Sequence, residues 1–280
     1  VRGTVATVRR LMVKTRAFLR ALARPASRNA GVESRPDQYK MTFAISRTAS
    51  FRSLQASIGA STYRLNTIFV GLDCIAKGMG DGGAVAVTWP KPSEKDAPSV
   101  AHQARSFACA ASLAFSFDVV DSFLRAFAKE EWLEFDPQTV RIATKAETRK
   151  GGAEYSISDR MRALLEDLKL EEDLVVATAE LFSRWRNAVV HQADRSNQLS
   201  SESKEALVNA KSHFHEKYSH IDIQLAINNF ESKNVPVAKE VTTLIAIIVN
   251  GCRLLDEAAI RRATPDSKAM DRVAETLLRR

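Results

Sequence analysis

Three polar side chains near the middle of the chain have the types and spacing needed for chemistry at a phosphate group. Arg186, Asn187 and His191 occur in the stretch LFSRWRNAVVHQ, residues 181–192. An arginine stays charged and presents a planar fork of N–H donors that matches phosphate oxygens. A histidine titrates near neutral pH, so it suits proton transfer. The combination indicates phosphate binding together with acid–base chemistry.

The element that positions these residues is predicted to be a helix over residues 173–192. Stepping about 100° per residue places Asn187 and His191 one turn apart, away from the core face, and Arg186 on the flank. The opposite face forms a buried stripe within about 60° of Trp185. Its members are Leu174, Thr178, Leu181, Phe182, Ala188 and Val189.

The spelling Arg-Asn-x-x-x-His resembles the motif of the HEPN superfamily, in which an Arg and a polar residue precede a His. Many HEPN proteins are metal-independent endoribonucleases, often toxins or antiviral effectors, built as helical bundles that dimerise through this helix. The resemblance covers the motif and the helical pattern of residues 101–263. It implies an all-α, up-and-down HEPN-like bundle with long irregular loops between helices. It also implies a homodimer through the helix of residues 173–192.

The resemblance assigns His191 as the acid or base, Arg186 as the phosphate clamp and Asn187 as a residue that orients the imidazole or contacts phosphate. RNA supplies its own nucleophile, the 2′-hydroxyl, so neither a metal ion nor another cofactor is expected. In catalytic HEPN proteins an acidic residue on an earlier helix often supports the Arg–His pair. Asp118 and Asp121 are therefore secondary candidates, and the alternative for both is a salt bridge or a solvated position.

The motif has a geometric difficulty within one chain. Positions 186 and 191 lie about 140° apart around an ideal helix, so their side chains do not share a face. Arg184 lies only about 20° from His191, two turns away, and remains an alternative to Arg186. Pairing two motif helices across a two-fold axis would let residues on different flanks converge, and would cover the apolar Val190 on the polar side.

The net charge of +8 is confined to the first 40 residues, which hold ten basic and two acidic side chains. The other 240 residues hold 31 of each sign, so the helical part is not basic. We expect residues 1–40 to be a disordered extension, or a stretch upstream of the true start at Met41. The rival interpretation is an Arg-rich targeting or nucleic-acid-binding arm. Residues 41–280 are predicted to form a single helical domain.

Cysteines and apolar runs indicate a cytoplasmic protein without a membrane span. Cys74, Cys109 and Cys252 lie far apart in apolar helical runs, as reduced core thiols do. The strongest apolar run, residues 241–249, is too short to cross a bilayer. The cluster of His213, His215 and His220 lacks the cysteines of a zinc site.

The remaining pattern predicts helices over residues 51–77, 99–131, 158–168, 203–218, 221–230, 236–263 and 265–280. The first is predicted to break near Gly59, and the second to bury residues that include Phe107, with residues 78–99 as a loop. A short strand is predicted over residues 140–144. It is followed by a small basic loop, Lys145, Arg149 and Lys150, whose charges suit RNA phosphates.

Two other function classes remain open from the sequence. The chain could be a catalytically silent HEPN-like module that binds RNA or a partner protein through the same polar face. It could also be an unrelated helical bundle that serves as an interaction protein. The expected partners are RNA, a second copy of the chain, and a cognate antitoxin or regulatory protein.

Overall fold

The computed structural model describes residues 45–79, 90–191, 198–218 and 221–278, apart from the side chain of His191. Within these ranges the chain forms ten α-helices and one 3-10 helix, and no strand, so the predicted all-α class is confirmed. The predictions for residues 1–40 and for the start at Met41 lie outside the described residues. The helices are α2 (Ala49–Ala76), α3 (Ala97–Ala128), η2 (Glu131–Leu133), α4 (Pro137–Thr144), α5 (Ile157–Asp167), α6 (Asp173–His191), α7 (Ser201–Asn209), α8 (Lys211–Lys217), α9 (Ile223–Glu231), α10 (Ala238–Ala263) and α11 (Ser267–Leu278).

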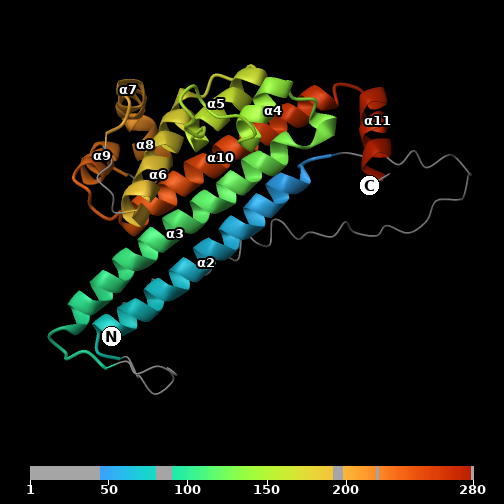
Figure 1. Cartoon of the computed structure of the whole chain (residues 1–280). Helices are drawn as coiled ribbons and strands as arrows, with labels where there is room; N and C mark the ends of the chain where they lie inside the picture. The colour runs from blue at the N-terminus through green and yellow to red at the C-terminus, as the bar shows by residue number, and fades with distance from the viewer. Residues whose placement is uncertain (1–44, 80–89, 192–197, 219–220, 279–280) are drawn as a thin grey trace, which may run out of the picture. The chain divides into compact units, whose positions relative to one another are not determined.

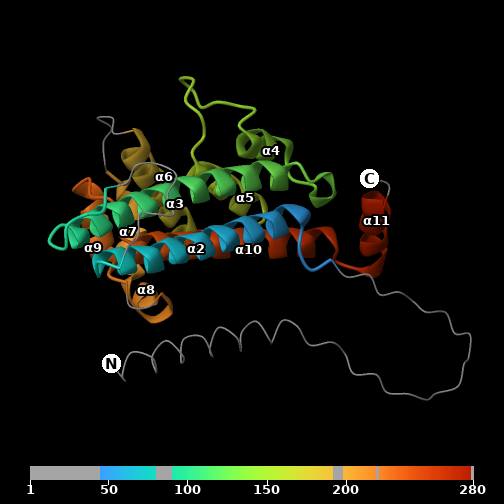
Figure 2. The same ribbon diagram turned by 90° about the horizontal axis from the view of Figure 1, so that it is seen from below.

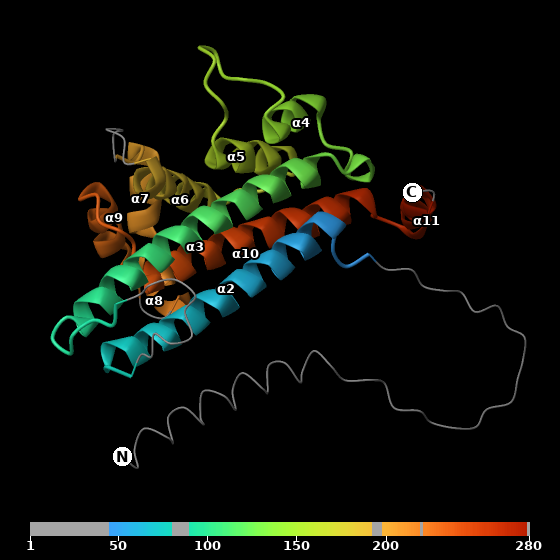
Figure 3. The same cartoon turned by 60° about the horizontal axis from the view of Figure 1, so that its bottom comes forward.

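Three long helices, α2, α3 and α10, run side by side and form the framework (Figures 1 and 3). Helices α2 and α3 pack against each other along a hairpin, and α6 lies against both α3 and α10. Helices α4 and α5 cover one end of α3, whereas α7 packs against α6, and α8 and α9 adjoin α7; Figure 2 shows α4 and α8 on opposite sides of the long helices. The core is continuous through these helices, with Phe51, Leu113, Phe182, Trp185 and Ile248 all fully or almost fully buried. This core fixes the rotation of α6 about its own axis.

A buried arginine joins α3, α4 and α5. The side chain of Arg160 is completely buried, and its Nε donates to the carbonyl oxygen of Ala143 at 2.8 Å. Its Nη1 pairs with the carboxylate of Asp121, and its Nη2 donates to the Asp121 carbonyl at 3.1 Å. Burial alone would raise the pKa of Asp121, but Arg160 and Lys145 outweigh that effect and lower it. Asp121 therefore stays ionised as the partner of a buried cation.

Several predicted elements differ in the structure. Residues 140–144 belong to helix α4, not to a strand. Asp136 caps this helix through the N–H of Gln138 at 2.8 Å, and Pro137 occupies its first turn. This pair is a strong start signal, which outweighs the strand propensity of a few β-branched residues. Helix α5 begins at a capping box formed by Ser156 and Asp159, two residues before the predicted cap.

Other boundaries changed by smaller amounts. Helix α2 continues through Gly59 without a break. The helix predicted for residues 203–218 is two helices, α7 and α8, which meet at Ala210. Cys74 is exposed, whereas Cys109 and Cys252 are buried core thiols as predicted. Burial raises the pKa of the Cys109 thiol.

Helix α3 combines core residues with exposed apolar side chains, among them Phe107 and Phe115. Among the described helices, α3 is the one that is long and apolar enough to cross a membrane, with a mean hydropathy of 1.5 over an 18-residue window. The prediction that the chain has no apolar run long enough to cross a bilayer is therefore not met by α3. Only 44% of that window is buried, and core helices of soluble proteins pass the same test, so this is weak evidence for a span. Phe107, predicted to face inward, is 76% exposed because it lies about 120° from Leu113 around the helix.

The exposed ring of Phe107 lines an apolar groove on the surface. The groove between α2 and α3 encloses about 400 Å³ and is lined mainly by small and apolar side chains. Its lining residues are Ser61, Arg64, Leu65, Ile68, Ala104, Phe107, Ala108, Ala111, Ser112 and Phe115. We refer to it below as the α2–α3 groove.

Candidate functional site

The motif helix has nearly the predicted extent, and its core face is wider than predicted. Helix α6 covers Asp173–His191, and Thr178, Leu181, Phe182 and Trp185 of the predicted stripe are buried. The other predicted members, Leu174, Ala188 and Val189, are half-buried, whereas Val175, Val176, Ala177 and Ala179 are buried outside the stripe. The indole Nε1 of Trp185 donates to the carbonyl oxygen of Asn234 at 2.9 Å, and its ring centre lies 6.0 Å from that of Phe230. The helix is thus anchored on the side opposite the polar residues of the motif.

Arg186 is held in place by neighbours on its own helix and on α3. Its guanidinium carbon lies 4.7 Å from the centre of the Phe117 ring, a cation–π distance. Its Nη2 is 3.7 Å from Oδ1 of Asp118, and its Nη1 donates to Oδ1 of Asn187 at 3.2 Å. The Arg186 side chain is only 19% exposed, whereas that of Asp118 is 70% exposed. The structure therefore brings Arg186, Asn187 and Asp118 together and directs Asp121 elsewhere.

The other two candidates on this helix are placed differently. Position 191 ends α6, and the side chain of His191 lies outside the described residues. Arg184 is directed to Glu180, one turn earlier, and its Nε donates to Oε1 of Glu180 at 2.7 Å. Arg184 is half exposed and borders the cavity described next.

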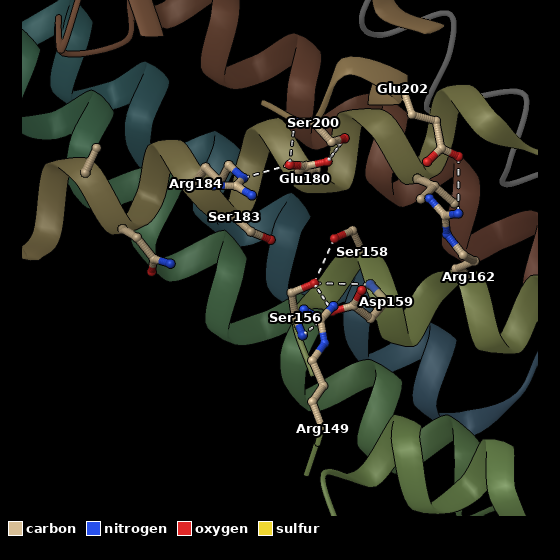
Figure 4. Close-up of a pocket in the computed structure, with 13 residues that line it drawn as sticks. Arg149, Ser156, Ser158, Asp159, Arg162, Glu180, Ser183, Arg184, Ser200 and Glu202 are labelled. Atoms are coloured by element: carbon tan, nitrogen blue, oxygen red, sulfur yellow. Dashed lines mark hydrogen bonds and ion pairs between the residues drawn. The ribbon is translucent and has the colours of Figure 1, made fainter. Parts of the chain in front are cut away.

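A polar cavity of about 560 Å³ lies beside the motif helix, where α5, α6 and α7 meet (Figure 4). Figure 4 shows Glu180, Ser183 and Arg184 on one side and Arg149, Ser156 and Asp159 on the other. The full lining is Arg149, Ser156, Ser158, Asp159, Arg162, Val176, Glu180, Ser183, Arg184, Asn187, Ala188, Ser200 and Glu202. Asn187 of the motif is thus also a wall of the cavity, which we call the polar cavity.

Glu180 is fully engaged at the edge of this cavity. Its carboxylate accepts the backbone N–H of Ser200 at 3.0 Å and the hydroxyls of Ser200 and Ser203, each at 2.7 Å, besides Arg184. Burial would raise the pKa of Glu180, but the hydrogen bonds from Ser203 and Ser200 outweigh it and lower the pKa. A residue of α6 therefore binds the N-terminus of α7 as an ionised group.

Two more ion pairs complete the walls. Asp159 accepts the N–H of Ser156 at 2.8 Å and the Ser156 hydroxyl, and it pairs with the guanidinium of Arg149. Arg162 donates from Nη1 to Oε1 of Glu202 at 3.2 Å. The three arginines of the cavity are each 43–46% exposed, so these are pairs at a wetted surface.

The predicted basic loop is only partly directed toward this site. Lys145 turns away from solvent, with Nζ 3.2 Å from Oδ1 of Asp121 and 3.0 Å from Oε2 of Glu154. Arg149 lines the polar cavity, and Lys150 is exposed. Arg162 and Glu180 were not among the predicted site residues. No local pattern marks them, because they reach the cavity only when α5 and α7 fold against α6.

The described residues contain no group of three or more His, Cys, Asp or Glu side chains that could hold a metal ion. This statement covers His213 and His215, whereas His220 lies outside the described residues. Comparisons with protein families, with curated proteins and with solved structures find no match to this chain.

Proposed function

We propose that the protein is a metal-independent endoribonuclease of the HEPN type, which cleaves RNA by attack of the 2′-hydroxyl. The observation that supports this proposal most is the hydrogen bond between Arg186 and Asn187 at the wall of a polar cavity. It joins the two consecutive residues of the motif to a hollow lined by Arg149, Arg162 and Arg184. The cavity is large enough for a small ligand.

In this proposal Arg186 stabilises the negative charge that develops on the scissile phosphate. Phe117 and Asn187 restrain its guanidinium before substrate arrives, so little orientational freedom remains to be lost on binding. His191 exchanges protons with the 2′-hydroxyl or the leaving 5′ oxygen. Asn187 contacts the substrate in the cavity and holds Arg186 through the hydrogen bond between the two residues.

The proposal includes a homodimer through α6. Val190 lies near the end of this helix and is 44% exposed, between residues of the motif. A second α6 would cover Val190 and add another Arg186 and His191 to the site. By the same resemblance, the biological setting is that of a toxin or antiviral effector controlled by an antitoxin or regulatory protein.

The test is incubation of the full chain with structured RNA in the presence of EDTA. Products should carry a 2′,3′-cyclic phosphate and a 5′-hydroxyl. Arg186→Ala and His191→Ala should each reduce the cleavage rate by about 10²–10³-fold, as loss of one transition-state donor or acid–base group does. Asp118→Asn should change it by less than about threefold, because this exposed carboxylate is weakly coupled to Arg186.

Arg253→Ala is the matched control. Arg253 is half exposed on α10, pairs with Glu257 at 3.1 Å and lies outside the polar cavity. The RNA cleavage activity of Arg253→Ala should equal that of the unmodified chain. A requirement for Mg²⁺, or 5′-phosphate product ends, would contradict the mechanism. RNA binding without any cleavage would instead identify a catalytically silent HEPN-like module.

A further inference from the structure

We propose that the polar cavity is a ribonucleotide subsite, which holds the sugar and phosphate of the RNA residue next to the scissile phosphate. The assignment of a neighbouring scissile phosphate rests on the proposed ribonuclease function. The binding of a ribonucleotide segment does not, because it follows from the hydrogen-bonding capacity of the cavity.

The cavity has more N–H donors than its own acceptors use. It contains three arginines and three carboxylates. The acceptors of Glu180 are taken by Ser200, Ser203 and Arg184, and those of Asp159 by Ser156 and Arg149. A guanidinium has five N–H donors. Within the described part of the chain, each cavity arginine has one hydrogen bond or ion pair, through Nη2 of Arg149, Nη1 of Arg162 and Nε of Arg184. The unused donors favour a ligand rich in acceptor oxygens, such as a phosphodiester.

Two helix N-termini also border the cavity, and each is already occupied. Ser156 caps α5 and Ser200 caps α7, and both serines line the polar cavity. The partial positive charge at a helix N-terminus favours a nearby anion, and Asp159 and Glu180 meet that preference at the two ends. A phosphodiester would therefore be held by the unused N–H donors of the arginines.

Two serine hydroxyls of the cavity can serve only as acceptors for a ligand. The hydroxyl of Ser183 donates to the carbonyl oxygen of Ala179 at 2.7 Å, and that of Ser200 donates to Glu180 at 2.7 Å while accepting the N–H of Ser203 at 3.2 Å. The hydroxyl of Ser156 is saturated, because it donates to Asp159 and accepts from the Asp159 N–H and from Ser158. The lone pairs that remain on Ser183 and Ser200 match a donor on the ligand. The 2′-hydroxyl of ribose is such a donor, so the cavity should prefer RNA to DNA.

The cavity is also connected to the motif. Asn187 lines the cavity and accepts a hydrogen bond from Nη1 of Arg186 at 3.2 Å. A strand that contacts Asn187 from the cavity therefore reaches the residue that positions the catalytic guanidinium. The sugar–phosphate repeat of RNA supplies the groups for both places.

The experiment separates the two members of one ion pair. Binding of a fluorescent single-stranded RNA octamer is measured by anisotropy at several salt concentrations, on the full chain carrying His191→Ala to prevent cleavage. Arg162→Ala should weaken binding by about tenfold and lower the salt slope by about 1, the effect of one lost phosphate contact. Glu202→Gln should leave binding unchanged or tighten it, because the arginine remains and a negative charge is removed.

Weaker binding in Arg162→Ala without weaker binding in Glu202→Gln distinguishes ligand binding from a structural role. If the ion pair were only structural, both substitutions would weaken binding. The matched control is the pair Arg253 and Glu257, whose atoms lie 3.1 Å apart, compared with 3.2 Å for Arg162 and Glu202. Arg253→Ala and Glu257→Gln should leave RNA binding unchanged. Folding of every variant is checked by circular dichroism, and Arg162→Lys should retain most of the affinity.

Equal weakening by Arg162→Ala and Glu202→Gln, or no effect of Arg162→Ala, would overturn the subsite. Equal affinity for RNA and DNA octamers would also overturn it. Adenosine monophosphate is the third ligand tested. If the protein binds it as tightly as the RNA octamer, the cavity is a site for a free nucleotide and not for a strand. Cleavage with unaltered binding in Arg162→Ala would leave the ribonuclease proposal intact. Absence of cleavage with the expected binding pattern would refute only the ribonuclease.

Discussion

The polar cavity and the α2–α3 groove are two surface hollows of similar size with opposite chemistry. In the polar cavity, Glu180 and Asp159 are each held by several donors, and spare guanidinium donors face the solvent. In the groove, Phe107 and Ile68 project beside a floor of small residues, with Arg64 as its one charged lining residue. A polar hollow selects a ligand by matching hydrogen bonds, whereas an apolar groove gains stability from any apolar surface that excludes water.

This difference indicates how the two surfaces relate to function. Chemistry requires restrained charges of known orientation, and only the polar cavity provides them, next to Arg186 and Asn187. The groove exposes apolar area of the kind that marks an interaction surface on many proteins. Two side chains show this contrast most directly: Trp185 is buried on the core side of α6, and Phe107 is exposed at the groove.

The largest expected effect comes from these two aromatic residues. Trp185→Ala should lower the free energy of unfolding by about 3–5 kcal/mol, because it empties a packed site and leaves the Asn234 carbonyl without its donor. Phe107→Ala should change it by less than about 0.5 kcal/mol, because the ring is already exposed. Urea denaturation of both variants measures the difference. A similar loss in both would show that the groove is covered in solution.

The second prediction compares the two surfaces as dimer interfaces. If the homodimer forms through α6, Val190→Glu should weaken it by about 100-fold or more, because two like charges would meet at the two-fold axis. The variant should be a folded monomer with reduced activity. Phe107→Glu should leave the dimer unchanged. Sedimentation of both variants decides this, and dissociation by Phe107→Glu alone would place the interface at the α2–α3 groove.

The smallest predicted effect concerns the carboxylate that joins α6 to α7. The pKa of Glu180 is lowered in the folded protein, so its stabilising contribution is complete above the unfolded value of about 4.3. That contribution is lost as the pH falls through the folded pKa. Glu180→Gln should therefore destabilise the protein by about 1–3 kcal/mol at pH 7 and by progressively less below pH 4. Urea denaturation across this range provides the measurement, and a constant difference would contradict the role of the charge.

The sequence alone was sufficient for the features that depend on local periodicity. The centre of the core stripe of α6 follows from apolar spacing within a single helix, and Trp185 is buried as that spacing requires. Val176 and Ala179 lie outside the predicted stripe and are also buried, because further helices pack against α6. The all-α class follows from the same pattern repeated along the chain. Where prediction failed locally, as at residues 140–144, the start signal at Asp136 and Pro137 outweighed the propensity of the residues after it.

The partners of the charged residues were decided by tertiary structure. Asp121 was a candidate for the motif, but folding places it against Arg160, 39 residues later in the chain. Glu180 binds the N-terminus of α7, and Arg162 faces Glu202, 40 residues away. A charged side chain has no periodic signal that names its partner, because ion pairs depend on which surfaces meet in three dimensions. The motif could therefore be located from the sequence, whereas the cavity beside it exists only after α5, α6 and α7 have packed together.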